Sequence, residues 1–227
     1  MSLKIFEDLE QGSPEWLEAR RGIITASVVG QLITPSTVKP AANDKSRALI
    51  LSLAAERITG IIEPVFPNRD MERGTYEEPI IRGLYAEHYA PVKEIGFMTR
   101  EVDGYRIGYS PDGLVGEDGL IEIKSRRQKK QMQTILTDKV PPENMAQLQC
   151  GLLVSGRKWI DYVSFCGGMP LYVKRVTPDK RWQDAILTAV EAFEEKASLI
   201  VEDFERLTAG MPDTEPTNFD LMEGMSW

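Results

Sequence analysis

The sequence predicts an α/β protein in which helices flank a small mixed β-sheet. Helical periodicity dominates the first part of the chain, short strand-like runs with alternating polarity follow, and a helix, two strands and a long helix complete it. That order of elements is typical of an α/β sandwich. The 227 residues are enough for one domain with a full core. We expect a single domain over residues 1–210 and an acidic tail over residues 211–227.

The N-terminal part is predicted to be mainly helical. Ser13 is a suitable N-cap because Pro14 follows at the first helical position, and Gly22 can end that helix. Thr25 is a suitable N-cap for a second, apolar helical pattern. The predicted helices cover residues 14–21, 25–33, 49–60 and 75–89.

The middle and the end of the chain are predicted to carry the sheet and a long helix. The Pro141-Pro142 pair starts one helix and Ser155-Gly156 ends it. The predicted elements are three strands of an antiparallel meander (94–100, 105–109 and 120–125), a helix (143–154), two further strands (159–165 and 171–176) and a long helix (178–207).

Composition excludes several classes of site. His88 is the only histidine and Cys150 and Cys166 are the only cysteines, which argues against His-rich metal sites, Cys-ligated zinc and iron–sulfur clusters. No apolar run is long enough to span a membrane, and the first residues do not form a signal-peptide pattern. We therefore expect a cytoplasmic protein with reduced thiols and no membrane partner.

Positive charge is concentrated in one run although the net charge is −8. The run is Lys124-Ser-Arg-Arg-Gln-Lys-Lys130, and it contains Arg126 and Arg127. An acidic protein can bind nucleic acid through one focused basic surface. A solvated loop explains the run equally well.

The strongest chemical signal is a pair of acids next to a lysine. Asp112 lies in the turn sequence Ser110-Pro-Asp-Gly113, and Glu122 and Lys124 alternate with isoleucines in the following strand. A hairpin or short crossover would bring Asp112 beside Glu122. Two carboxylates and an ammonium group on a rigid sheet edge suit Mg²⁺ or Mn²⁺. The alternative is an exposed strand face whose charges are merely solvated.

Two further positions suggest chemistry more weakly. Glu77 shares a helical face with Ile81 and Leu84, where an unpartnered carboxylate would be costly, so it is a candidate third acid of the metal site. Alternatively it lies in the first turn and interacts with the helix dipole. Arg20 and Ser27 flank a predicted helix start, which is suited to an anion, although an ordinary cap explains it too.

Five segments together resemble a known family. They are Arg20-Arg-Gly-Ile-Ile-Thr-Ala-Ser27, Gly74-Thr-Tyr-Glu77, Ser110-Pro-Asp-Gly113, Leu120-Ile-Glu-Ile-Lys124 and Met145-Ala-Gln-Leu-Gln149. In order and spacing they resemble the YqaJ-like viral recombinase family, which includes phage λ exonuclease, in the PD-(D/E)XK nuclease superfamily. The resemblance implies a restriction-endonuclease-like core with a central mixed, mostly antiparallel sheet.

The resemblance also implies an activity. Such enzymes are Mg²⁺-dependent 5′→3′ exonucleases of linear double-stranded DNA, with Mn²⁺ as a substitute and two ions in each site. They release mononucleotides and leave a 3′ single strand for an annealing protein in recombination. It further implies a ring-shaped homotrimer in a bacterial or phage-infected cell.

Individual roles follow from the same resemblance. As metal ligands it implies Asp112, Glu122, the Ile123 carbonyl and Glu77. Lys124 and Gln147 would act with Glu77 in catalysis. For the 5′-phosphate and DNA it implies Arg20 and Ser27, and we add Arg126, Arg127 and Gln149.

One departure and two alternatives remain. An arginine that the family places after the Ser27 helix has no clear match, and Lys39 or Arg47 would have to replace it. Two alternatives to an exonuclease are a catalytically idle DNA-end clamp or scaffold of the same fold, and an endonuclease of the same superfamily.

Overall fold

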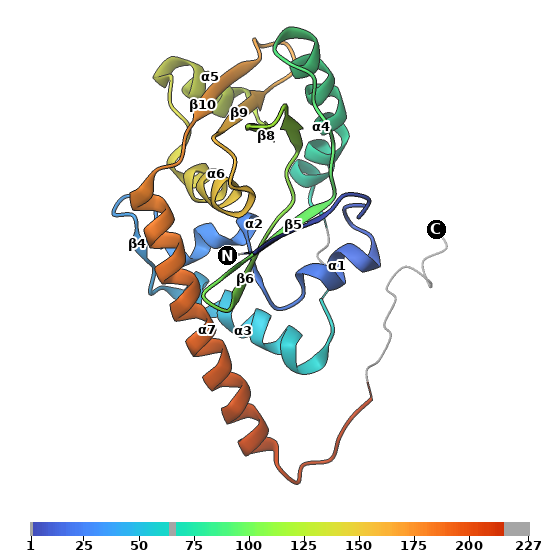
Figure 1. Ribbon diagram of the computed structural model, residues 1–227, viewed down its shortest axis with the longest axis vertical. Helices are drawn as coiled ribbons and strands as arrows, with labels where there is room; N and C mark the ends of the chain where they lie inside the picture. The colour runs from blue at the N-terminus through green and yellow to red at the C-terminus, as the bar shows by residue number, and fades with distance from the viewer. Residues whose placement is uncertain (1, 64–66, 216–227) are drawn as a thin grey trace.

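A computed structural model describes residues 2–63 and 67–215, and residues 216–227 of the predicted tail lie outside this range (Figure 1). The helices are α1 (Pro14–Arg20), α2 (Ala26–Val29), α3 (Asp44–Thr59), α4 (Arg69–His88), α5 (Gln128–Thr137), α6 (Pro142–Ser155) and α7 (Lys180–Thr208), with a 3₁₀ turn η1 (Gly30–Leu32). The strands are β1 (Ser2–Phe6), β2 (Ile24–Thr25), β3 (Ile33–Thr34), β4 (Lys39–Pro40), β5 (Phe97–Val102), β6 (Tyr105–Tyr109), β7 (Gly113–Val115), β8 (Gly119–Ser125), β9 (Trp159–Phe165) and β10 (Tyr172–Val176).

The predicted fold class is confirmed, because mixed sheets are flanked by helices, but the strands are divided between two four-stranded sheets and the separate β3–β4 pair. The first sheet has the order β1-β5-β6-β2 and the second has the order β10-β9-β8-β7. The predicted meander is wrong in one respect: β5 and β6 pair antiparallel, whereas β8 pairs with β7 and β9. The reason is the turn at Ser110-Pro111-Asp112, which takes the chain out of the first sheet and into the second.

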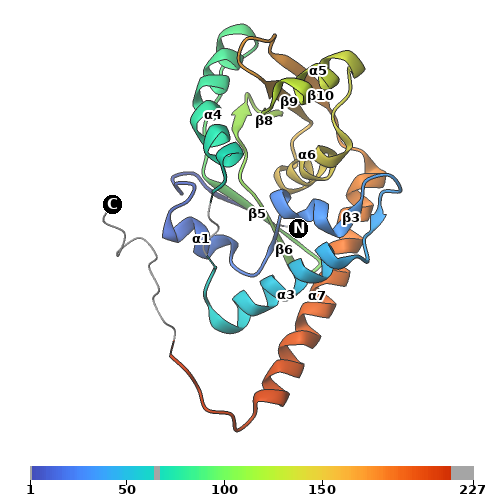
Figure 2. The same cartoon turned by 180° about the vertical axis from the view of Figure 1, so that it is seen from behind.

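The second sheet contributes residues to both of the main hydrophobic cores. The larger core joins both sheets to α3, α6 and α7. Its residues include Ile107, Leu148 and Phe193, and from the second sheet Leu120 and Ile160. The smaller core lies between α4 and the second sheet and includes Ile81 and Ile121. Figure 2 shows α3 and α7 together at the end of the molecule opposite α4. The chain from β6 to β7 therefore passes between two sheets that share one hydrophobic core.

Helix α4 begins earlier than the sequence pattern predicts. The side chain of Asn68 accepts hydrogen bonds from the backbone N–H groups of Asp70 and Met71, so the helix starts at Arg69 rather than Thr75. Pro79 consequently lies inside the helix. Glu77 is not in the first turn, so the interpretation of Glu77 as a residue that stabilises the helix dipole is wrong.

No helix within residues 2–63 and 67–215 combines the length and hydropathy needed to cross a membrane.

Candidate active site at the junction of the two sheets

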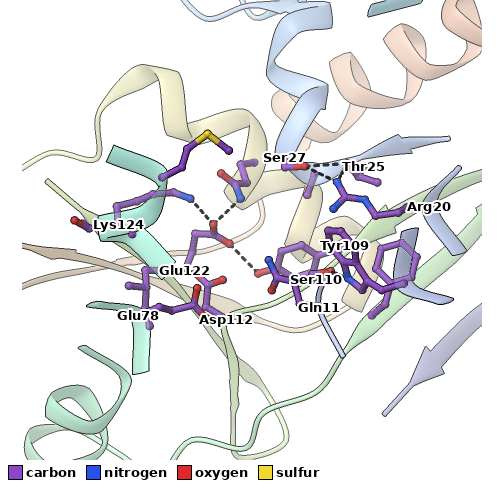
Figure 3. A pocket seen from close by; sticks show the side chains of 18 of the residues that line it. Gln11, Arg20, Thr25, Ser27, Glu78, Tyr109, Ser110, Asp112, Glu122 and Lys124 are labelled. Carbon is purple, nitrogen blue, oxygen red and sulfur yellow. Dashed lines mark hydrogen bonds and ion pairs between the residues drawn. The ribbon is translucent and has the colours of Figure 1, made fainter. Parts of the chain in front are cut away.

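A cavity of about 520 Å³ opens where the two sheets meet (Figure 3). Its walls come from α1, α2, the N-terminal half of α4, β8, α6 and the turn after β6. The lining residues that could bind a ligand or take part in a reaction are Arg20, Ser27, Glu78, Asp112, Glu122 and Lys124. Figure 3 shows the carboxylates at one end and Arg20 with two hydroxyl groups at the other. We call these the acid end (Glu78, Asp112 and Glu122) and the arginine end (Arg20, Thr25 and Ser27).

The β7–β8 hairpin brings Asp112 to Glu122, as the sequence predicted. Gly113 lies opposite Ile121 in the antiparallel register. Asp112 Oδ2 accepts a hydrogen bond from the Ile123 backbone N–H at 2.6 Å. Burial and then the charge of Glu122 raise the pKa of Asp112 well above its usual value. Glu122 is buried and Asp112 is partly buried, so the two carboxylates repel each other and a cation would stabilise them.

Glu122 is held by three side chains. It is 1% exposed, and its Oε1 accepts hydrogen bonds from Lys124 Nζ at 2.7 Å and from the Gln147 amide. Its Oε2 accepts from the Tyr109 hydroxyl at 3.3 Å. Burial alone would lower the pKa of Lys124, but the charges of Glu122 and Asp112 outweigh it and raise that pKa. Lys124 is therefore a charged ammonium group beside the acids.

Sequence reasoning chose the wrong glutamate of α4 for the cavity. Glu77 accepts a hydrogen bond from the Ser125 hydroxyl at 2.6 Å and is not among the residues that line the cavity. Glu78 lines it instead, next to the acids of the second sheet. Burial raises the pKa of Glu78 against the opposing charge of Arg82, and Glu122 raises it further. The third acid near the cavity is thus Glu78.

At the arginine end, the charged guanidinium group of Arg20 contacts neutral groups of the protein. Arg20 Nη2 donates hydrogen bonds to the hydroxyls of Thr25 at 3.3 Å and Ser27 at 3.2 Å. The guanidinium lies over the Trp16 ring, 3.9 Å from its centre, and Trp16 Nε1 donates to Ser110 Oγ at 2.9 Å. Burial lowers the pKa of Arg20, and the negative charge of Glu56 partly opposes this effect. The arginine end therefore suits an anionic ligand.

Thr25 does not cap a helix as predicted. Helix α2 has only four residues, and the Thr25 side chain makes no capping hydrogen bond. It hydrogen bonds with Ser27 and Arg20 instead. The side chains of this segment, rather than a helix N-terminus, therefore form the arginine end.

A family model described as the YqaJ-like viral recombinase domain matches residues 15–158, more than half of the chain. The chain belongs to this family. The crystal structure of an alkaline exonuclease, LHK-Exo from Laribacter hongkongensis, has a TM-score of 0.77 and 32% identity, covering 88% of this chain and 100% of that one. The complex of LHK-Exo with dAMP matches equally well.

A phage-related exonuclease from Haemophilus somnus shares the fold of this YqaJ-like chain. It has a TM-score of 0.59 at 14% identity and covers 80% of this chain and 96% of that one. A search of curated protein sequences finds no match.

In this member of the YqaJ-like family, one of the two glutamines of α6 faces the cavity. Gln147 lines it and donates to Glu122. Gln149 is fully buried on another side of the helix, where its amide donates to the Thr177 carbonyl at 2.9 Å and accepts from the Asp179 N–H at 2.8 Å. The expected contact of Gln149 with DNA is therefore wrong: this side chain joins α6 to the start of α7.

Helix α6 can approach the site closely because residue 151 is glycine. A Cβ atom on Gly151 would lie 2.8 Å from the Tyr109 ring, too close for two carbon atoms. One turn earlier on the same helix is Gln147. The Tyr109 hydroxyl and the Gln147 amide can thus both reach Glu122.

The predicted basic residues lie in different environments. Arg126 donates to Asn144 at 2.6 Å and to the Tyr162 hydroxyl at 3.1 Å, so it is engaged within the protein. Arg127 is 73% exposed and pairs with Asp70, which lines the cavity, at 3.0 Å. Neither Lys39 nor Arg47 lines the cavity. Of these basic residues, Arg127 is the one that is both exposed and paired with a residue of the cavity wall.

The acid end has the oxygen donors that Mg²⁺ prefers. Asp112 and Glu122 supply carboxylates, and Ile123, whose carbonyl is the expected further ligand, also lines the cavity. Within residues 2–63 and 67–215, no three His, Cys, Asp or Glu side chains form a group able to hold a metal ion. Mg²⁺ is usually bound by one or two carboxylates, with water and substrate phosphates completing its coordination. The residues present fit that arrangement.

Proposed function

We propose that this protein is a Mg²⁺-dependent exonuclease that degrades one strand of linear double-stranded DNA in the 5′→3′ direction. It releases mononucleotides and leaves a 3′ single strand for an annealing protein. One observation carries the proposal: a single cavity contains paired carboxylates with a lysine at one end and an arginine that donates to two hydroxyls at the other. Such a cavity suits a DNA end whose 5′-phosphate is bound beside the bond to be cut.

The structural relative supports this choice of substrate. LHK-Exo is an alkaline exonuclease and has been crystallised with dAMP. A nucleoside 5′-monophosphate is the kind of product that such cleavage releases. At 32% identity over 88% of the chain, a related activity is the simplest expectation.

The residues divide the chemical work between them. Asp112, Glu122 and the Ile123 carbonyl would hold the metal, with Glu78 in place of Glu77 as the third acid. Two Mg²⁺ ions, or Mn²⁺ as a substitute, would supply charge neutralisation and a nucleophile at neutral pH. Lys124 orients the attacking water and stabilises charge on the phosphate, and Gln147 supports this arrangement through Glu122.

Arg20 and Ser27 would bind the terminal 5′-phosphate, to which arginine can donate two parallel hydrogen bonds. Arg127 would contact the DNA backbone nearby. The proposal also includes a ring-shaped homotrimer and an annealing protein as partner. Both of these rest on the resemblance to the family.

Digestion of defined DNA ends tests the proposal. With Mg²⁺, linear duplex DNA should be degraded to mononucleotides, faster when the 5′ end is phosphorylated than when it carries a hydroxyl. EDTA should stop the reaction and added Mg²⁺ should restore it. Absence of cleavage with Mg²⁺ or Mn²⁺, despite binding of DNA ends, would identify an idle clamp. Nicking of a closed circle would identify an endonuclease.

A further inference from the structure

Arg82 contacts the acid end from inside the protein. Its side chain is only 14% exposed, and it lies one helical turn after Glu78 on α4. Arg82 Nε donates a hydrogen bond to the main-chain carbonyl of Asp112 at 2.8 Å, and Nη2 donates to Glu78 Oε1. Nη1 pairs with the exposed carboxylate of Glu94 at 2.8 Å. One planar group therefore joins α4 to the turn that carries Asp112.

These contacts hold Asp112 from two sides. Its carboxylate is fixed by the Ile123 N–H, and its peptide carbonyl is fixed by Arg82. The same guanidinium orients Glu78, which comes from a different element. Because the donors of arginine form a rigid fork, the Asp112 carbonyl and the Glu78 carboxylate are held at one separation. A lysine would provide the charge without that geometry.

A second arginine also joins a main-chain carbonyl to a carboxylate, but away from the cavity. Arg57 Nε donates to the Gly22 carbonyl at 2.7 Å, and its two terminal nitrogens bind Glu194 at 2.7 and 2.8 Å. Arg57 is 26% exposed and does not line the cavity. Arg57 is therefore a comparison residue that joins two segments by hydrogen bonds without contacting the acid end.

We propose that Arg82 is a positioning residue of the cleavage centre, which sets the affinity for the divalent cation by holding Asp112 and Glu78 in place. The inference rests on the proposed function, since it concerns the metal site of that reaction. Residues that orient metal ligands without touching the metal typically change metal affinity or activity by about 10- to 100-fold when they are replaced. Arg82 would act in this way because it binds the Glu78 carboxylate and the main-chain carbonyl of Asp112.

Direct titration of Mn²⁺ by electron paramagnetic resonance tests the proposal without requiring cleavage. Arg82→Lys and Arg82→Ala should each weaken Mn²⁺ binding by about tenfold or more. Both should raise the Mg²⁺ concentration needed for half-maximal cleavage, while the preference for 5′-phosphorylated ends is retained. Lysine keeps the positive charge of Arg82 but not its planar geometry. If Arg82→Lys binds Mn²⁺ as weakly as Arg82→Ala does, the geometry of the arginine rather than its charge is what Mn²⁺ binding requires.

Arg57→Lys is the matched control. It should lower thermal stability as Arg82→Lys does and leave Mn²⁺ binding within twofold of the native value. If Arg82→Ala does not fold, Arg82→Lys decides the question. Native-like Mn²⁺ affinity in folded Arg82→Lys overturns this inference alone. Absence of Mn²⁺ binding and cleavage in the native protein overturns the proposed function and this inference together.

Discussion

The two ends of the cavity differ in how their charges are balanced. At the acid end, Glu122 accepts hydrogen bonds from Tyr109, Lys124 and Gln147, and Asp112 accepts from the Ile123 N–H. At the arginine end, Arg20 touches two hydroxyls and an aromatic ring. The protein therefore organises its carboxylates with its own hydrogen-bond donors, whereas the hydrogen-bond partners of Arg20 are neutral hydroxyls and the charge of Glu56 acts on it without a hydrogen bond.

This difference follows from the cost of burial. A buried carboxylate is tolerated when it is hydrogen bonded, and Glu122 has donors at both oxygens. Arg20 rests on Trp16, which stabilises a guanidinium without neutralising it. The acid end is accordingly organised before any ligand arrives, and the arginine end remains open to an anion. Three substitutions, in order of expected effect, test this contrast.

The largest effect should follow from Lys124→Ala. Removing the ammonium group takes away stabilisation of charge on the phosphate, so kcat should fall by about 100- to 1000-fold. Cleavage of a linear duplex under saturating Mg²⁺ measures it. Lys158→Ala is the control, since Lys158 is 74% exposed and pairs with Asp118 on the surface. If both variants cleave like the native protein, Lys124 is not part of the cleavage centre.

A smaller and more selective effect should follow from Arg20→Ala. Hydrogen bonds to charged groups contribute about 1.5–3 kcal/mol, so the rate on 5′-phosphorylated ends should fall by about 10- to 100-fold. The rate on 5′-hydroxyl ends should change much less, and the ratio of the two rates is the measurement.

Arg47→Ala is the control for charge, because Arg47 is exposed and pairs with Asp44. An equal loss on both kinds of DNA end in Arg20→Ala would show that Arg20 does not read the phosphate.

The smallest effect should follow from Ser27→Ala. One neutral hydroxyl contributes about 0.5–1.5 kcal/mol, which corresponds to a loss of about two- to tenfold on 5′-phosphorylated ends. Competition between phosphorylated and unphosphorylated duplexes in one reaction would resolve it. Thr25→Ser, which keeps a hydroxyl beside Arg20, should stay close to the native ratio. A loss in Thr25→Ser as large as in Ser27→Ala would point to general disturbance of the segment.

The paired acids were predictable because their signals are local. A Pro-Asp-Gly turn and strict alternation in the next strand place Asp112, Glu122 and Lys124 together with few long-range assumptions. The division into two sheets was not predictable in this way, because alternation identifies a strand but not its partner. Strand β7 is only three residues long and does not stand out as a strand in the sequence.

Helix rotation explains the two errors in the predicted site. Glu77 and Glu78 lie four and three residues before the buried Ile81, and both spacings are typical of one helical face. Only the packing of α4 on the second sheet decides that Glu78 reaches the cavity. The two glutamines are two residues apart, so they project in different directions from α6. The helix was predicted, but the side that faces the acids was not.

Gly151 shows how far the requirements of this site extend along the chain. It carries no functional group, yet any side chain there would displace either the helix or the Tyr109 ring. Two of the donors to Glu122 depend on that contact. Among related proteins that keep this arrangement, the freedom to vary should therefore be as small at position 151 as at the carboxylates themselves. We expect an insertion or a larger residue at position 151 to occur only in relatives that also have a different residue at position 109.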